Sequence, residues 1–321
     1  MSQPEHQPPA QPLLVLLAGI LAVSAASIFI RYAQIYAPSL VIAVYRLALA
    51  SLILAPFAYW RYRGELRSLG LRDLRLAILS GLFLALHFAT WITSLEYTSV
   101  ASSVVLVATA PLWVALLSPF TLREPVSRAV LVGMLLALGG GAVIGLSDSC
   151  TWQPGGLVCP PLADFVSGEA FLGDTLALAG ALMAAAYILI GRSLRSKMTL
   201  IPYIFVVYSM AAIVLVVLMF AAGQSPIGYP APAYGWFLLL AIVPQLLGHS
   251  SFNWALRYLS AAYVSIALLG EPVGSTILAY FLLRETPASL KIFGAILILA
   301  GIYIASRSEA RQPAQDLSET S

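Results

Sequence analysis

Charged residues are scarce in this chain. Only 10% of its 321 residues are Asp, Glu, Lys or Arg, whereas 60% are hydrophobic, and the mean hydropathy is +0.90. An ordinary soluble domain is about a quarter charged, so these few charges could not cover a water-exposed surface. The composition excludes a cytosolic enzyme, a nucleic-acid binder and a disordered chain. It indicates a protein that crosses a lipid bilayer several times.

Sequence motifs for enzymes and cofactors are also missing. The chain has no HExxH, no GxSxG and no GxxxxGK[ST] sequence, and no paired His and Cys at metal-ligand spacing. We therefore expect no enzymatic activity, no ATP-driven pumping by this chain, no cofactor and no metal site. The formal net charge of +3 is too small to suggest a nucleic-acid partner.

Long apolar segments are abundant in the chain. A spanning helix needs roughly 20 mostly apolar residues, and ten segments meet this requirement. They are residues 13–32, 39–60, 75–95, 99–121, 128–147, 172–191, 200–221, 234–256, 261–283 and 289–307. The sequence predicts an all-α integral membrane protein with ten transmembrane helices. We expect the polar tails, 1–12 and 308–321, to be disordered.

The positions of Lys and Arg predict the orientation of the chain in the membrane. With the N-terminus in the cytoplasm, 13 of the 17 cations fall in cytoplasmic loops or tails, three fall outside, and Arg46 lies within a span. This bias favours a cell membrane protein, in the inner or plasma membrane, with both termini in the cytoplasm. The same orientation places the loop 148–171 outside.

The sequence repeats itself at an offset of 161 residues. Residues 120–124 (FTLRE) align with residues 281–285 (FLLRE). The same offset aligns Pro111 with Pro272 and Arg31 with Arg192. Five spans are therefore duplicated, and an odd number of spans makes the second copy enter the membrane with the opposite orientation. Inverted repeats of this kind are typical of secondary transporters, whose sites lie near the midplane between the halves.

Several short motifs of the chain are similar to those of a known family. They are residues 45–50 (YRLALA), 93–103 (TSLEYTSVASS), 110–117 (APLWVALL), 255–262 (ALRYLSAA), 270–273 (GEPV) and 283–285 (LRE). Together they resemble the EamA-type branch of the drug/metabolite transporter superfamily, over residues 13–147 and 172–307. The resemblance implies two inverted five-helix repeats, with helices 1–4 and 6–9 around a central cavity. The chain departs from the family where Arg123 and Arg284 replace a common Gly before Glu.

Two ionisable residues lie well inside predicted spans, where they usually face a cavity or a partner. Glu271 lies about halfway along the ninth span and precedes Pro272. It could carry a proton during transport, pair with a cationic substrate, or only fix helix packing. Arg46 could pair with Glu271 or Glu96, bind a carboxylate, or extend to the outer surface. We assign Arg46 and Glu271 to coupling or gating.

Two polar and aromatic helix faces supply candidate substrate-binding residues. The third span places His87, Trp91 and Ser94 on one face. The eighth span presents Gln245, His249, Phe252 and Asn253. These spans are repeat partners, so their faces should meet across a cavity that could hold an amphipathic metabolite. Trp113 and Tyr187 are further candidates for the cavity wall, although either could face lipid instead.

The loop at 148–171 contains both cysteines of the chain, Cys150 and Cys159. An extracytoplasmic loop permits a disulfide. We expect a local tether, and a lid over a pore mouth is the alternative. A stripe of small residues in the fifth span, with glycines in the tenth, favours close packing within the chain or in a homodimer.

These patterns together predict a secondary active transporter. We expect it to export small organic metabolites, such as amino acids or amphipathic compounds, by alternating access, with proton coupling as an option. A passive facilitator or channel that uses the same central cavity is the alternative. The expected partners are a small-molecule substrate and the lipid bilayer.

Overall fold

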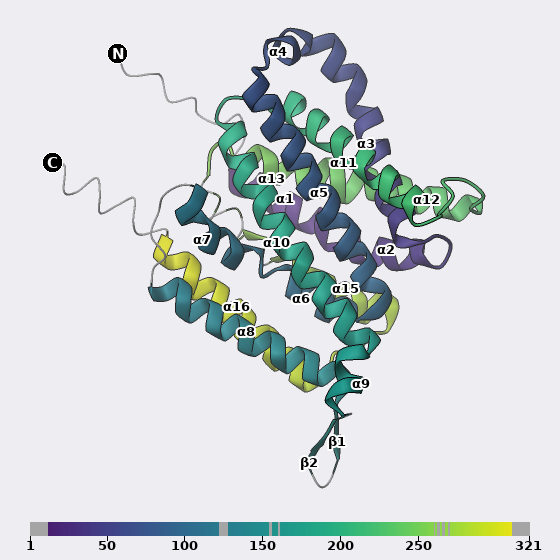
Figure 1. Cartoon of the computed structure of the whole chain (residues 1–321), viewed down its shortest axis with the longest axis vertical. Helices are drawn as coiled ribbons and strands as arrows, with labels where there is room; N and C mark the ends of the chain where they lie inside the picture. Colours follow the sequence, from purple (N-terminus) through teal and green to yellow (C-terminus); the bar gives the residue numbers. More distant parts are fainter. Residues whose placement is uncertain are drawn as a thin grey trace, which may run out of the picture.

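A computed structural model describes residues 12–121, 128–153, 156–159, 161–259, 261, 264, 267–268 and 270–309. Helices make up nearly all of this part of the chain (Figure 1). The first half contains α1 (Pro12–Ser24), α2 (Ala26–Gln34), α3 (Ser39–Arg61), α4 (Arg63–Ser68), α5 (Leu71–Tyr97), α6 (Val100–Val107), α7 (Ala110–Thr121) and α8 (Arg128–Ser149).

The second half follows a short hairpin and mirrors the first half in its main helices. The hairpin is formed by β1 (Thr151–Gln153) and β2 (Gly156–Val158), and α9 (Leu162–Ser167) leads into the second half. The second half then contains α10 (Glu169–Arg195), α11 (Leu200–Ala221), α12 (Ala231–Leu240), the π-helix η1 (Ala241–His249), α13 (Ser250–Ala255), α15 (Gly270–Leu278), the π-helix η2 (Ala279–Leu283) and α16 (Ser289–Glu309).

Seven helical segments of the described residues are long and apolar enough to cross a membrane. They are Leu14–Gln34, Ser39–Arg61, Leu71–Tyr97, Val100–Leu117, Glu169–Arg195, Leu200–Ala221 and Ala231–Ala255. Two shorter apolar stretches, Leu131–Gly141 and Ser289–Gly301, lie in α8 and α16. The predicted span 261–283 falls partly outside the described residues. The chain is therefore a multi-pass membrane protein, and seven of the ten expected spans are found by length and hydropathy.

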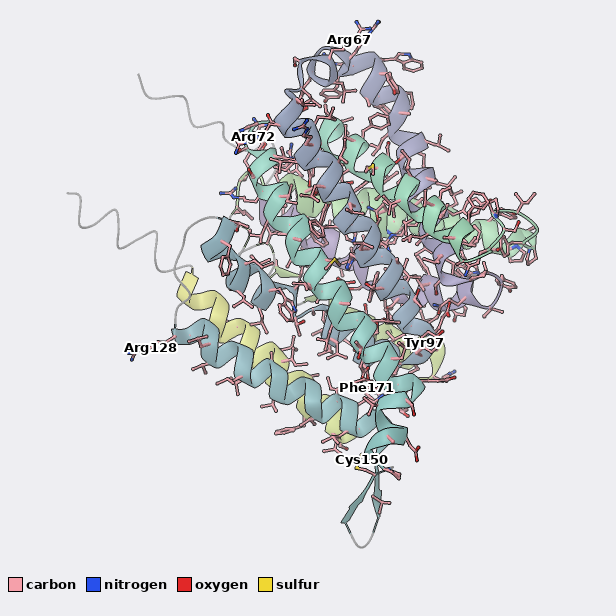
Figure 2. All side chains as sticks on the ribbon, in the orientation of Figure 1. Arg67, Arg72, Tyr97, Arg128, Cys150 and Phe171 are labelled. Carbon is pink, nitrogen blue, oxygen red and sulfur yellow. A yellow bond between two sulfur atoms is a disulfide. The ribbon has the colours of Figure 1, made fainter. Side chains whose placement is uncertain are left out.

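The loop between the halves adds a short β-hairpin that the sequence patterns did not predict. Residues 148–171 include the antiparallel pair β1 and β2, in which Thr151 lies opposite Val158. Cys150 and Cys159 flank these strands and are joined by a disulfide. Figure 2 shows Cys150 beside this hairpin, at the end of the molecule opposite Arg67. A cross-link between adjacent strand ends holds a two-stranded ribbon, which is marginal by itself in water.

Three predicted spans depart from a regular α-helix near prolines. The segment 99–121 divides into α6 and α7 at Ala108 and Thr109, shortly before Pro111. Proline has no backbone N–H and clashes with the preceding turn, so it ends or kinks a helix. The π-helix η1, which continues α12 with a wider turn, contains Pro244. In the second half, α15 begins at Gly270, two residues before Pro272.

Small residues hold the last helices of the two halves together. Helices α8 and α16 lie side by side along one edge of the molecule (Figure 1). A Cβ added at Gly140 would lie 2.5 Å from the carbonyl oxygen of Gly294, and one at Gly301 would lie 2.5 Å from that of Gly133. These backbones approach too closely for any side chain. The small residues of α8 and α16 thus pack against each other within the chain.

Candidate functional site

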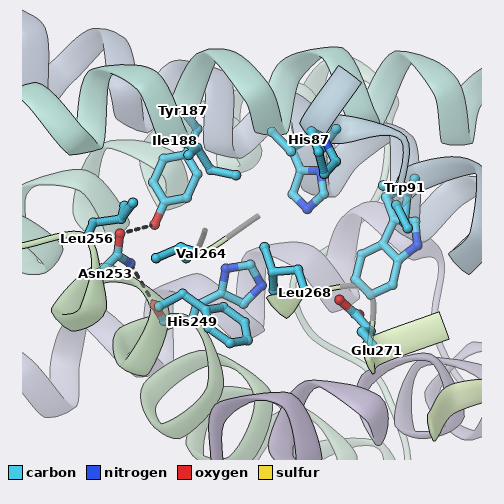
Figure 3. Close-up of a pocket in the computed structure, with 16 residues that line it drawn as sticks. His87, Trp91, Tyr187, Ile188, His249, Asn253, Leu256, Val264, Leu268 and Glu271 are labelled. Carbon is cyan, nitrogen blue, oxygen red and sulfur yellow. Dashed lines mark hydrogen bonds between the residues drawn. The ribbon is translucent and has the colours of Figure 1, made fainter. Parts of the chain in front are cut away.

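A pocket of about 80 Å³ lies where the two halves meet (Figure 3). It is smaller than the few hundred cubic ångströms of ordinary small-molecule sites. Most of its walls are apolar. Its lining residues are His87, Trp91, Val107, Ala108, Ala110, Pro111, Ala184, Tyr187, Ile188, His249, Phe252, Asn253, Leu256, Val264, Leu268 and Glu271.

The segments 99–121 and 261–283 both line this pocket. Val107 and Ala110 flank the break between α6 and α7, and Leu268 and Glu271 are their counterparts at the offset of 161. Glu271 lies in the first turn of α15, and its backbone N–H donates to the Leu268 carbonyl at 3.0 Å. Glu271 therefore lies at the start of a helix, although it falls about halfway along the predicted span. The first turn of a helix favours a carboxylate because its N–H groups carry partial positive charge.

The two histidines point into the pocket from opposite walls (Figure 3). Their ring centroids are 6.4 Å apart. The Nδ1 atom of His87 lies 2.9 Å from the Gly180 carbonyl. A carbonyl only accepts, so Nδ1 of the neutral ring carries the proton and Nε2 is left as an acceptor. Trp91 stacks on His87 at 5.8 Å. The faces predicted from α5 and from η1 with α13 do meet.

A hydrogen-bonded pair lines one end of the pocket. The Tyr187 hydroxyl donates to Asn253 Oδ1 at 2.7 Å (Figure 3). The Asn253 amide donates to the His249 carbonyl at 2.9 Å and to the Tyr208 hydroxyl at 3.4 Å. Asn253 of α13 is therefore held by α10, α11 and η1 together. A side chain fixed in this way can orient a polar group of a bound solute.

Arg46 lies behind the aromatic wall of the pocket and is fully buried. Its Nε donates to Gln245 Oε1 at 2.8 Å, and its guanidinium carbon lies 4.1 Å from the centroid of Phe88. Glu96, one expected partner, instead accepts from the backbone N–H and the hydroxyl of Ser39. The ion pairs found among the described residues are Arg31 with Glu285 and Lys197 with Asp73.

Several buried donors around Arg46 have no acceptor within the described structure. They are Nη1 and Nη2 of Arg46, Nε1 of Trp91 and Nε2 of Gln245. An unpaired buried donor costs about 1–3 kcal/mol, and more when it is charged. These donors belong to α3, α5 and η1. The arrangement suits a water or an anionic group.

Some expected site residues lie outside the pocket lining. Gln245 is buried but contacts Arg46, and Trp113 is half-buried against the core. Arg123 and Glu124, the first-half counterparts of Arg284 and Glu285, lie outside the described residues. The geometry gathers His87, Trp91, Tyr187, His249, Asn253 and Glu271 around one pocket.

Three charged residues have surroundings that the sequence patterns do not reveal. Arg195 falls in a predicted cytoplasmic loop, but it is buried and donates from Nε to the Asn253 carbonyl at 2.9 Å. Asp174 is buried and accepts from the Thr98 hydroxyl at 3.0 Å. Arg31 falls at the outer end of the first predicted span, yet it pairs with Glu285 at 3.2 Å. Each lies near a helix end, where sequence cannot separate a buried charge from a solvated one.

The two halves make equivalent contacts at opposite ends of the pocket region. Arg31 Nη1 donates to the Leu95 carbonyl at 2.5 Å, and Arg192 Nη1 donates to the Leu256 carbonyl at 2.7 Å. Both partners are related by the offset of 161. Glu285 adds a further contact at the Arg31 end, because its Oε2 accepts from the backbone N–H of Val100 at 3.0 Å.

The pocket extends toward only one of these ends. Five of the lining residues of the second half lie toward the Arg192 end: Ala184, Tyr187, Ile188, Asn253 and Leu256. Their counterparts in the first half are all buried and do not line the pocket; these are Val23, Ala26, Ser27, Ile92 and Leu95. The molecule is therefore closed at the Arg31 end and hollowed toward the Arg192 end.

A membrane protein with a pocket between two similar halves has the architecture of a solute carrier. The EamA-like transporter family model matches residues 11–146 and 171–307, so the chain belongs to this family and contains two EamA domains.

Curated relatives and one solved structure agree with this family. Two proteins of Archaeoglobus fulgidus, each named an uncharacterized transporter, are 23% and 27% identical to the chain. They cover 92% and 91% of it, and the matches span 97% and 95% of their own lengths. A solved crystal structure matches with a TM-score of 0.62 at 17% identity, over 94% of this chain and 98% of that one. That likeness concerns the fold alone.

Proposed function

We propose that the protein is a secondary active transporter that exports small organic metabolites, either amino acids or amphipathic compounds, by alternating access. The observation that carries this proposal is the uneven pocket. It lies between the halves and reaches Tyr187 and Leu256, whereas the equivalent positions near Arg31 are packed solid. Rocking of one half against the other would exchange the open and closed ends.

The proposed topology has ten spans in two inverted five-helix repeats. The first repeat would use α1 with α2, α3, α5, α6 with α7, and α8. The second would use α10, α11, α12 with α13, the segment 261–283, and α16. The bias of Lys and Arg supports cytoplasmic termini in a cell membrane. In this orientation the Arg192 end faces the cytoplasm, so the pocket is hollowed toward the side from which an exporter loads.

The chemistry of the pocket supports a solute with an apolar body and a carboxylate. Trp91 and Phe252 supply flat apolar walls, and the unpaired donors of Arg46 and Gln245 lie close behind them. Glu271 faces the same space and could hold an ammonium group or a proton. We propose that Arg46 and Glu271 act in coupling or gating. A homodimer is a further proposal, although the glycine stripe is occupied within the chain.

Flux into proteoliposomes tests the proposal. Labelled amino acids and amphipathic carboxylic acids would be assayed with and without a pH gradient, with protein-free vesicles as background. We expect flux that rises with the gradient and that Glu271→Gln removes, because an amide cannot carry the proton. Glu169→Gln, at an exposed carboxylate in the first turn of α10, is the matched control. If no solute moves above background, transport itself is refuted.

The alternative is a passive facilitator or channel with the same cavity. Counter-flow separates the two mechanisms, because a carrier exchanges labelled for unlabelled solute across the membrane. Stimulation by solute on the opposite side would support alternating access. Its absence at saturating solute would favour the facilitator.

A further inference from the structure

A second cavity lies on the other side of α15 from the central pocket. It is an apolar groove of about 240 Å³ between α6, α15 and α16, with Ile144 of α8 at its floor. Glu271 faces the pocket, whereas the next residues, Pro272 and Val273, line the groove. Its rim carries exposed aliphatic side chains that would meet the bilayer: Val273, Ile277, Ile292 and Ile296.

One end of the groove is polar. A neighbouring pocket of about 140 Å³ shares Ala101, Thr276, Pro287 and Lys291 with the groove and adds Ser99, Glu285 and Thr286. Lys291 Nζ donates to the Ser99 hydroxyl at 2.9 Å. Glu285 is paired with Arg31. Among the described residues, the charged groups at this end are Lys291, Glu285 and its partner Arg31.

We propose that the groove binds a phospholipid of net negative charge. One acyl chain lies along α15 and α16, and the headgroup phosphate lies beside Lys291. Hydrocarbon matches the dry aliphatic walls, and a phosphate matches the ammonium and hydroxyl groups at the polar end. The order of the two parts also matches a lipid, because the polar end lies at the helix termini and the apolar part runs inward from it.

The site has a structural consequence for the pocket. A lipid in the groove would brace α15, whose first turn presents Glu271 to the central pocket. It would also lie against Thr276 and Pro287, close to the Arg31–Glu285 pair. Binding to the folded state would raise the apparent stability of the protein.

Lipid retention tests this proposal with two pairs of variants. Lys291→Gln removes the cation, and Arg61→Gln removes an exposed cation at the end of α3 as its control. Ala295→Phe fills the groove, and Ala300→Phe adds the same bulk on the exposed face of the same helix. The full chain would be purified from nanodiscs of phosphatidylcholine mixed in equal parts with phosphatidylglycerol. Native mass spectrometry then counts bound lipids, and thermal unfolding gives the lipid-dependent shift.

We expect one phosphatidylglycerol on the unmodified chain. Lys291→Gln should reduce its affinity about fivefold, the factor for one basic residue beside an anionic headgroup. Ala295→Phe should remove it, and both controls should retain it. Equal retention of phosphatidylcholine would overturn the charge assignment. Retention of phosphatidylglycerol by Ala295→Phe would overturn the groove as its site, as would a second copy of the chain in place of the lipid.

Discussion

The Arg31 end and the Arg192 end of this molecule share one contact, but the pocket reaches only the Arg192 end. In each half, an arginine near a helix C-terminus donates to a carbonyl at the end of a neighbouring helix, Leu95 in the first half and Leu256 in the second. Only the Arg31 contact is joined, within the described residues, by a carboxylate, that of Glu285. The duplicated sequence therefore supplies the same scaffold twice. The Glu285 ion pair lies at the closed end, and its counterpart at the hollow end, Glu124, falls outside the described residues.

Differences between aligned residues have the same effect within the pocket. Phe88 in the first half aligns with His249 in the second, and Ile92 aligns with Asn253. The first of each pair is a fully buried apolar side chain, and the second lines the pocket. Duplication fixes the backbone frame, whereas these substitutions make one side polar. Mutations at three places test what these differences do: the contact of α8 with α16 that joins the two halves, the closed Arg31 end, and the pocket.

The largest effect should come from the joint between the halves. Gly140→Leu would drive a side chain into the Gly294 carbonyl of α16, and overpacking of this kind costs about 1–3 kcal/mol or prevents folding. Gly139→Leu should be tolerated, because a Cβ at this adjacent position would meet no other atom within 4 Å. Thermal unfolding and monodispersity of the two variants measure the contrast. Equal behaviour would mean that α8 and α16 do not form a rigid joint.

The next effect concerns the closed end. Glu285→Gln should open it, because hydrogen bonds to a charged group contribute about 1.5–3 kcal/mol, which corresponds to at least about tenfold in an equilibrium. Both native cysteines form the disulfide, so Ser27→Cys adds a single buried thiol. A membrane-impermeant maleimide should label that thiol from the hairpin side far faster when Glu285→Gln is also present.

Two comparisons control that experiment. Ile188→Cys, the counterpart of Ser27→Cys at the offset of 161, should label from the opposite side without any further change, since Ile188 lines the pocket. Arg192→Gln should not expose Ser27→Cys. Unchanged labelling in a folded Glu285→Gln protein would show that the ion pair does not hold the end closed.

The sequence predicted the membrane spans and the two halves better than the helix breaks and the side-chain partners. Hydropathy located seven of the expected spans, and the offset of 161 located both halves, because apolar length and duplication are properties of the chain itself. The faces of His87 and His249 followed from helical periodicity. The breaks at Ala108 and before Gly270, and the partner of Arg46, did not follow. They depend on which side chains meet in space, and Gln245 reaches Arg46 from a helix 199 positions away.

A smaller effect should come from the polar side of the pocket. Tyr187→Phe removes the donor to Asn253, and loss of one hydrogen bond costs about 0.5–1.5 kcal/mol. For a solute identified by the flux assay, KM should rise up to about tenfold with little change in the maximal rate. Tyr203→Phe removes a hydroxyl bonded to Ser80, away from the pocket, and should leave KM unchanged. A rise in KM for both variants would assign Tyr187 to packing alone.

The smallest effect should come from Arg284. Its φ is 59°, the left-handed conformation, and it ends η2 directly before Glu285. A side chain in this conformation costs about 1–2 kcal/mol, and glycine avoids that cost. Comparing Arg284→Gly with Arg284→Ala isolates the backbone, because both remove the charge and only glycine relieves the conformation. We expect Arg284→Gly to be more stable by about 1 kcal/mol in thermal unfolding. If the alanine variant is equally stable, the left-handed turn is not a source of strain, and the position of Glu285 depends on its bonds to Arg31 and Val100 alone.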